Sequence, residues 1–123
     1  MQPLGVVVLQ SDPKIAASLT AALANSFSSV HHANSATELR ALLNRRKTGI
    51  LILDIEAVSL LEVEHFSKDF PKAYIVCTHR VPDEDMWIAA LAAGATDICP
   101  SSDIPGIVRS ALGSATSAEG AAA

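Results

Sequence analysis

The stretch Ile50-Leu51-Ile52-Leu53-Asp54 decides the fold. Four consecutive aliphatic residues predict a strand that is buried on both faces, which is typical of a parallel sheet covered by helices on each side. Val6-Val7-Val8-Leu9 is a second run of the same kind. Because parallel strands need long crossover connections, the segment between these runs is expected to contain helices.

A helical pattern follows the first apolar run. Apolar residues recur every four positions over Lys14–Leu23 and predict one buried helix face. Asp12 supplies an N-cap oxygen, and Pro13 occupies the first helical position. The other expected elements are a weak strand over 29–33, a helix that opens with a capping box at 35–38 and is stopped by Gly49, a short helix over 60–66, a strand over 73–77 that leads into Thr78 and His79, a helix over 82–93 ended by Gly94, a strand over 96–99 and a helix over 104–112.

Length and element order together predict the fold class. A chain of 123 residues is enough for one domain with one sheet. Strands that alternate with helices predict an α/β protein with a single doubly wound five-stranded parallel sheet and helices on both faces. We place this domain at residues 1–112 and interpret 113–123, which is small and polar, as a flexible tail or linker stub.

Composition excludes several classes of protein. The net charge of −4 argues against direct nucleic-acid binding. No apolar run is long enough to cross a membrane and no signal sequence is recognised, so a cytoplasmic location is expected. Cys77 and Cys99 form neither a CxxC motif nor a disulfide framework, and they are expected to be buried, inert thiols. His31 and His32 are adjacent in a strand and point to opposite faces, so they are not expected to chelate a metal.

The carboxyl ends of the predicted strands hold the candidate functional residues. In sheets of this type, ligands bind at that edge, near the point where the strand order reverses. The residues there are Gln10, Ser11 and Asp12 after the first strand, Asp54 after the third, Thr78 and His79 after the fourth, and Pro100, Ser101 and Ser102 after the fifth.

Three of the segments, in this order, resemble the receiver domain of response regulators, the CheY-like branch of the flavodoxin-like fold. They are the aspartate that ends ILILD (Asp54), the threonine that ends YIVCT (Thr78), and GATDI at 94–98, which is similar to the family's Gly-Ala-x-Asp-aromatic segment. The resemblance covers residues 5 to about 112. It implies the flavodoxin-like (βα)5 fold with strand order 2-1-3-4-5.

In that family a histidine kinase phosphorylates the aspartate at the end of the third strand. The resemblance therefore implies that Asp54 is the phosphoacceptor position and that Thr78 is the hydroxyl that would bind a phosphoryl oxygen. Two acidic residues after the first strand hold Mg²⁺ in the family, and a lysine after the fifth strand pairs with the phosphate.

This sequence departs from the family at those supporting positions. Gln10 and Ser11 stand where the two acids are expected, and the next residue is the helix cap Asp12. Ser101 stands at the lysine position. Loss of a single preorganised charge commonly costs about 10²- to 10³-fold in rate, so Mg²⁺-dependent phosphorylation is not expected. An alternative extends the first strand by one residue and brings Asp12 into the pocket, where Asp12 and Asp54 would hold the metal.

The sequence therefore predicts a degenerate receiver, or pseudo-receiver, that works as a regulatory protein-interaction module in two-component (phosphorelay) signal transduction. It is expected to be no enzyme and to need no cofactor or metal. Two alternatives stay open. One is a functional receiver that is phosphorylated on Asp54, with Mg²⁺, through an altered pocket. The other is a flavodoxin-like binder of a small ligand, although the chain has no GxGxxG motif after the first strand.

Signalling proteins are the expected partners: a kinase, an output domain or another regulator. The resemblance implies that the helices over 82–93 and 104–112 form the docking face, and a homodimer is left open. Trp87 lies on the first of these helices and is either a core residue or an interface anchor. His79 has no predicted partner and is expected to face solvent.

Overall fold

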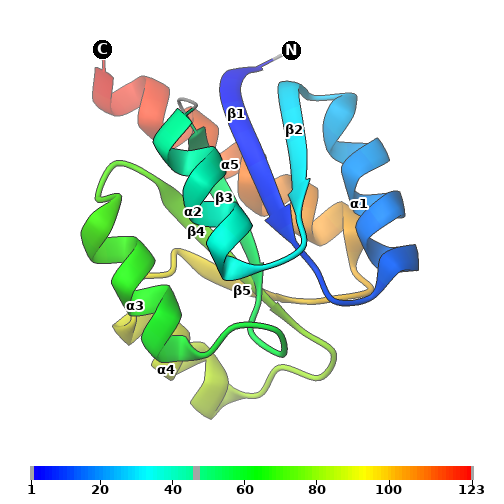
Figure 1. Ribbon diagram of the computed structural model, residues 1–123, viewed down its shortest axis with the longest axis vertical. Coiled ribbons are helices and arrows are strands. Elements are labelled where there is room, and N and C mark those ends of the chain that lie inside the picture. Colours follow the sequence, from blue (N-terminus) through cyan, green and yellow to red (C-terminus); the bar gives the residue numbers. More distant parts are fainter. Residues whose placement is uncertain (1, 46–47, 123) are drawn as a thin grey trace.

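Five strands and five helices alternate along the part of the chain that the computed structural model describes, residues 2–45 and 48–122 (Figure 1). Side chains are described at 5–45 and 49–115. The elements are β1 (Gln2–Leu9), α1 (Pro13–Ala24), β2 (Phe27–Ala33), α2 (Ala36–Arg45), β3 (Thr48–Asp54), α3 (Leu60–Asp69), β4 (Tyr74–His79), α4 (Glu84–Ala92), β5 (Asp97–Pro100) and α5 (Ile104–Ala122).

The five strands form one parallel sheet in the order β2-β1-β3-β4-β5. This confirms the predicted doubly wound fold and its strand order. The strand order reverses between β1 and β3, and the ends of these two strands lie beside each other, because Leu9 pairs with Leu53, the residue before Asp54. In the next pair of strands Asp54 is the register partner of Thr78. The strand ends that carry the candidate residues therefore meet at one edge of the sheet.

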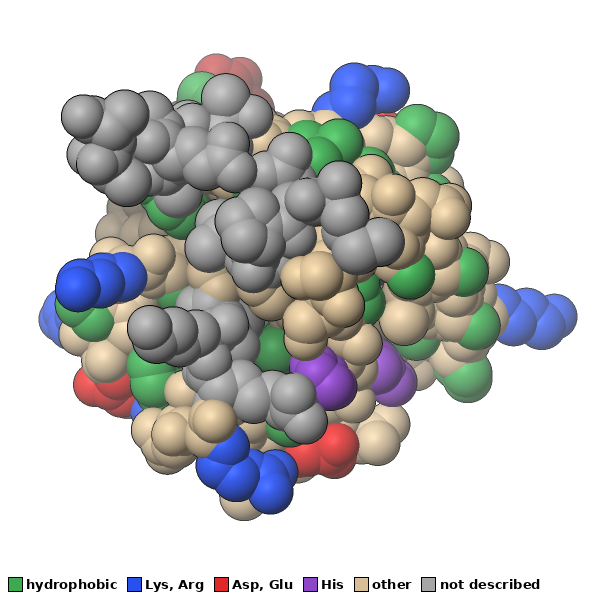
Figure 2. Space-filling model, turned by 90° about the horizontal axis from the view of Figure 1, so that it is seen from above, with side chains coloured by type: hydrophobic (Ala, Val, Ile, Leu, Met, Phe, Trp, Pro, Cys, Tyr) green, Lys and Arg blue, Asp and Glu red, His purple; other side chains and the backbone are tan. Residues whose placement is uncertain are grey.

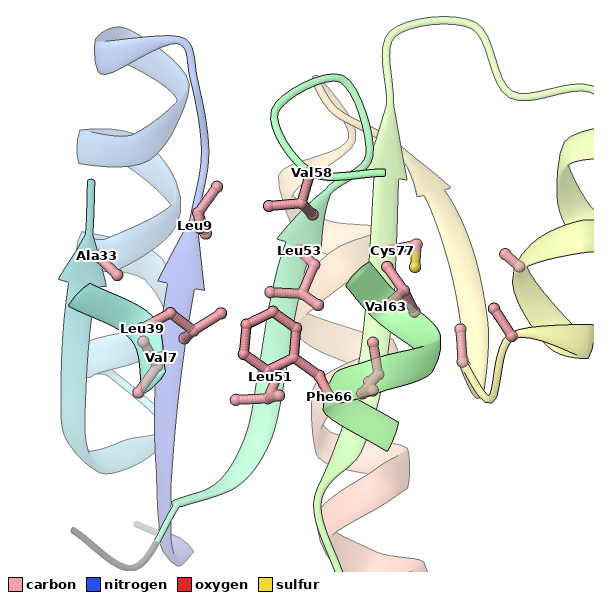
Figure 3. Packing of buried hydrophobic residues seen from close by; sticks show 14 of the residues in the cluster. Val7, Leu9, Ala33, Leu39, Leu51, Leu53, Val58, Val63, Phe66 and Cys77 are labelled. Atoms are coloured by element: carbon pink, nitrogen blue, oxygen red, sulfur yellow. The ribbon is translucent and has the colours of Figure 1, made fainter. Parts of the chain in front are cut away.

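The sheet separates two hydrophobic cores. On one face, alternate residues of β1, β3 and β4 pack against α2, α3 and α4, and the Phe66 ring lies over the strands beside Leu51 (Figure 3). On the other face, the remaining strand residues pack against Leu19 and Leu23 of α1 and Ile107 of α5. This arrangement explains why the central strands read as continuous apolar runs, since both of their faces are covered.

The start of α1 is fixed by the residues that the sequence indicated. The Asp12 side chain accepts the N–H groups of Lys14 (2.9 Å) and Ile15 (3.4 Å), and Pro13 is the first helical residue. The strand before it ends at Leu9. The alternative of a β1 that is one residue longer is therefore wrong, and Asp12 caps the helix.

The predictions for Gly49 and for the end of the last helix are wrong. Gly49 does not stop α2, because the helix spans Ala36–Arg45 and Gly49 lies inside β3, where the neighbouring Thr48 backbone already pairs with Gly5 of β1. The last helix does not end at residue 112 but continues to Ala122, since its second half is rich in alanine, the best helix former, and Ala115 is buried against the sheet. The segment 113–122 is therefore helical, while the division into a domain at 1–112 and a tail or linker stub at 113–123 stays a prediction.

Both cysteines are free and buried, as predicted. They lie on neighbouring strands one residue out of register, because Cys77 pairs with Ile98 while Cys99 pairs with Thr78. Adjacent positions point to opposite faces, and the two thiols accordingly belong to different cores. Burial raises the pKa of the Cys77 thiol to about 12 and also raises the pKa of Cys99.

Candidate functional site

The carboxyl edge of the sheet gathers the predicted site residues. Asp54 is 1% exposed at the end of β3, and Thr78 is fully buried on the adjacent β4. Gln10 follows β1 and Ser101 follows β5, and both are buried as well. Topology alone brings these four side chains to one place, although the residues are far apart in sequence.

The Asp54 carboxylate is covered by hydrogen bonds from its own chain. Its Oδ2 accepts the Ser11 hydroxyl at 2.5 Å and the Ser11 backbone N–H at 3.2 Å. Its Oδ1 accepts the Glu56 backbone N–H at 3.0 Å. Charge-assisted bonds of this kind satisfy a buried carboxylate in place of water or a metal ion. A phosphoryl donor would have to displace Ser11 to reach Oδ2.

Gln10 joins the loop after β1 to the neighbouring strands. Its side-chain amide donates to the Thr78 hydroxyl at 3.4 Å, and its side-chain oxygen accepts the Asp12 backbone N–H at 3.1 Å. The Thr78 hydroxyl thus has a protein partner, as expected for a buried polar group. Gln10 therefore places a neutral, hydrogen-bonded side chain at a position where the resemblance expects an acid.

Asp12 is the helix cap, and it also lies at the edge of the candidate site although β1 is not extended. One of its carboxylate oxygens, Oδ1, caps α1. The residue also lines a cleft of about 280 Å³, together with Gln10, Ser11, Ile15, Glu56, Arg80 and Ser101. Asp54 is not among the lining residues, which agrees with its burial beneath Ser11.

Glu56 and Arg80 form the rim of this cleft, and sequence reasoning did not identify either of them. The Glu56 carboxylate accepts the Arg80 backbone N–H and the Arg80 Nε, each at 2.8 Å. These bonds, the backbone bond first, hold the pKa of Glu56 below its ordinary value. The pair joins the loops after β3 and β4, and no sequence motif marks it because it depends on the conformation of both loops.

Ser101 is held by its backbone but not by its hydroxyl. Its N–H donates to the His79 carbonyl at 2.9 Å. Its Oγ is the one buried side-chain oxygen or nitrogen without a partner in the described part of the chain. A lysine ammonium at this place would supply charge to the cleft, whereas the serine supplies none.

His79 does not simply face solvent as the sequence suggested. It is half-buried, and its Nδ1 accepts the Val81 backbone N–H at 3.0 Å. This bond stays within the loop after β4 and orients the ring locally.

The donor set at the cleft does not fit a divalent metal well. Mg²⁺ takes hard oxygens in octahedral geometry, commonly from one or two carboxylates and waters. Here Asp54 is covered by hydrogen bonds, Asp12 is engaged as a helix cap, and Glu56 is paired with Arg80. Within the residues that the structure describes, no three His, Cys, Asp or Glu side chains are placed to share a metal ion. Nor does the described chain contain a helix that is long and apolar enough to span a membrane.

Comparison with known proteins supports the fold assignment. No family model matches the sequence, and no curated protein matches it. Solved structures do: a response regulator from Thermotoga maritima has a TM-score of 0.84 and 19% sequence identity over 93% of this chain and 98% of its own. A CheY-like receiver domain protein from Methanospirillum hungatei has a TM-score of 0.83 and 16% identity over 95% of this chain and 97% of its own.

A third similar structure has higher identity and lower structural similarity. The CheY-like protein TadZ from Pseudomonas aeruginosa has 26% identity and a TM-score of 0.68, over 86% of this chain and 91% of the other. The fold of the present chain is therefore the receiver fold of two-component response regulators.

Proposed function

We propose that this domain is an atypical receiver that regulates other signalling proteins by binding them, without a working Mg²⁺ and phosphorylation pocket. The receiver fold supports the placement in two-component signal transduction. The observation that carries the proposal is the state of Asp54: its carboxylate is 1% exposed and accepts bonds from Ser11 and Glu56. The groups that would neutralise a phosphoryl group are absent from positions 10, 11 and 101.

Phosphotransfer to a carboxylate depends on positioning and on charge neutralisation. In this cleft the only described cation at the rim is Arg80, and its Nε is bound to Glu56. Ser101 supplies no charge to the cleft, and its buried hydroxyl oxygen has no partner within the described chain. The domain accordingly acts through its surface, not through chemistry at Asp54, and it is no enzyme.

Incubation with acetyl phosphate and Mg²⁺, followed by intact-mass analysis, tests the proposal. We expect no mass gain for the wild-type chain and no Mg²⁺-dependent change in its amide NMR spectrum with beryllofluoride. The Asp54→Asn variant provides the matched control. A phosphoryl adduct on the wild-type protein that Asp54→Asn abolishes would overturn the proposal.

A repaired pocket gives the positive control. The double variant Ser11→Asp, Ser101→Lys returns one carboxylate and the ammonium to the places where the resemblance expects them. We expect this variant to bind Mg²⁺ and to gain the adduct on Asp54 that the wild type lacks. If the wild type and the double variant give the same mass, the residues at positions 11 and 101 are not the reason that the wild type lacks the adduct.

One observation favours a functional receiver as the second candidate. Arg80 lines the cleft, and its guanidinium has further N–H groups besides the Nε that Glu56 accepts. Release from Glu56 would let Arg80 supply the charge that Ser101 lacks. If this candidate is right, an adduct on Asp54 forms in the wild type and is lost in Arg80→Gln.

The expected docking face is supported by the exposure of one aromatic side chain. Trp87 on α4 is 47% exposed, which fits an interface anchor better than a core residue. We propose that signalling proteins of the cytoplasm bind at α4 and α5. The view of Figure 2 shows the end of the molecule that carries the start of β1, remote from α4, and there the described Lys and Arg side chains stand apart from one another around the rim. Such a distribution does not favour nucleic-acid binding at that end.

A further inference from the structure

Helix α4 is apolar on every side. Residues 86–93 are all apolar, and the helix contains no Lys or Arg. A helix that is hydrophobic all round is normally enclosed by the rest of the protein. Here only Ala90 of the helix is buried, and Ile88 is 54% exposed. A large part of the apolar surface of α4 therefore has no cover within the described chain.

The exposed large hydrophobic side chains gather around this helix. Among the described residues there are four of them: Trp87 and Ile88 on α4, Val81 in the loop before it, and Leu61 in the first turn of the neighbouring α3. Figure 1 shows α3 and α4 side by side. Scattered single apolar residues are normal on protein surfaces, but exposed apolar residues that share one surface mark an interaction site, and the two candidates for such a surface are Leu61 and Ile88, on neighbouring helices.

A groove runs between the two helices. It measures about 360 Å³ and is lined by Leu60, Leu61, Glu64, Ala89, Ala92 and Ala93. Ile88 is not in this lining, but it stands beside the groove, because it lies on the same side of α4 as Ala92, one turn later. Trp87 lies about 200° away from Ala89 around the helix axis, so it faces away from the groove. The groove is therefore a different surface from the α4–α5 face.

Uncompensated negative charge stands at one end of the groove. Helix α4 begins at the carboxyl edge of the sheet with Glu84 and Asp85, which lie one turn before Ile88 and Ala89 on the same sides of the helix. Neither carboxylate forms an ion pair within the described chain, whereas Glu64 in the groove lining is paired with Lys68 at 2.8 Å. A partner that buries the apolar groove would meet these charges and would need basic residues there.

We propose that the groove between α3 and α4 binds an amphipathic helix of a partner protein. Its aliphatic side chains pack against Leu61 and Ile88, and Lys or Arg residues at one of its ends lie near Glu84 and Asp85. Helix-in-groove recognition uses this combination of a shallow apolar groove and anchors on one helix face. The inference rests on the proposed function as an interaction module, and it adds the surface and the chemistry of the partner.

Titration of the full chain with synthetic helical peptides tests the inference. Two peptides share a stripe of leucines at positions i, i+3, i+4 and i+7; one has lysines at one end and the other has glutamates. Amide chemical-shift changes of ¹⁵N-labelled protein report where each peptide binds. We expect the basic peptide to bind at α3 and α4, at least tenfold more tightly than the acidic peptide, with an affinity that falls as salt rises.

Variants separate this groove from the α4–α5 face. Leu61→Ser with Ile88→Ser is expected to weaken binding at least tenfold, and Glu84→Gln with Asp85→Asn is expected to flatten the salt dependence. Trp87→Ser, which alters the other side of α4, is expected to change the affinity less than twofold. Unchanged circular dichroism is the check that each variant folds.

Three results would overturn the inference: equal affinity for both peptides, unaltered binding by the Leu61 and Ile88 double variant, or sedimentation that shows a dimer of the chain that this double variant abolishes. A phosphoryl adduct on Asp54 would overturn the proposed function but would leave these peptide results standing, so the two failures are distinguishable.

Discussion

Asp54 and Glu56 are two residues apart, but their carboxylates differ in exposure and in bonding partners because their surroundings differ. Asp54 is buried and bonded to Ser11, whereas Glu56 lies at the cleft rim and is paired with Arg80. The position of Asp54 could be predicted, since it follows from the end of an apolar strand. The Ser11 contact could not, because it depends on how the loop after β1 turns, and loop geometry leaves no periodic signal in the sequence.

Cys77 gives a prediction at this scale about pH. The folded-state pKa of about 12 exceeds the ordinary value of 9.0, so between these values the folded chain keeps a proton that the unfolded chain has lost. Stability must therefore fall as pH rises from about 9 towards 12, by up to about 1.4 kcal/mol per pH unit for this thiol. Urea titrations of wild type and Cys77→Ala over this range measure the slope, which should be shallower in the variant. Equal slopes would contradict the prediction.

Replacing either of two glycines by alanine gives a second prediction at the residue scale. The two changes in stability are expected to have opposite signs. Gly94 has φ +107°, and a Cβ there would overlap with the Ser67 side chain. We expect Gly94→Ala to destabilise the protein by about 1–3 kcal/mol. A Cβ at Gly113, inside α5, meets nothing within 4 Å. Gly113→Ala should stabilise by about 0.5–1 kcal/mol. Chemical denaturation measures the free energy of unfolding of both variants, and two changes of the same sign would contradict the prediction.

The accuracy of prediction for each element depended on whether a local signal marks its ends. The helix α1 begins where its capping residue Asp12 predicts, whereas α4 begins at Glu84, two residues after the predicted start at 82, because Asp83 is its N-cap. The predicted helix ends at Gly49 and at residue 112 are wrong. Gly49 lies in a strand that pairs with β1, and the last helix continues past residue 112, where Ala115 is buried. Such tertiary contacts override local preferences and are not visible in a single sequence.

The caps provide a prediction at the scale of the element. Asp12 accepts from Lys14 N–H, and Asp83 accepts from Met86 N–H at 2.8 Å. Replacing either aspartate by alanine leaves a helix end uncapped and should cost about 1 kcal/mol of unfolding free energy. Asp69→Ala is the matched control, because it removes only an exposed ion pair with Arg40 and should cost less than about 0.5 kcal/mol. Thermal unfolding of the three variants ranks them, and an equal loss in all three would refute a capping effect.

At the scale of the whole molecule, the fold could be predicted almost completely and the function only in outline. Alternation of apolar runs with helical patterns determines the parallel sheet, and the sheet determines which loops meet. The groove between α3 and α4 could not be predicted, because the same apolar run 86–93 would also suit a fully enclosed helix. Only the exposure of Leu61 and Ile88 in the assembled fold distinguishes the two cases.

The sheet predicts a gradient of local stability across the molecule. The strands β1, β3 and β4 have paired neighbours on both sides and helices over both faces, while β2 and β5 are at the edges. Amides of 50–53 and 75–77 should therefore exchange with solvent most slowly, through global unfolding, and amides of β2 faster. Hydrogen exchange followed by NMR measures this order. Protection of β2 equal to that of β3 would contradict it.

The first strand runs toward the cleft and the last helix runs away from it, so residues 2 and 122 lie at the same end of the molecule, remote from Asp54 (Figure 1). A tether, a fluorescent fusion or a bead attached through either terminus would hold the domain with its strand tips pointing outward. Immobilised in that orientation, the molecule would present the cleft and the beginnings of α3 and α4 to anything in solution.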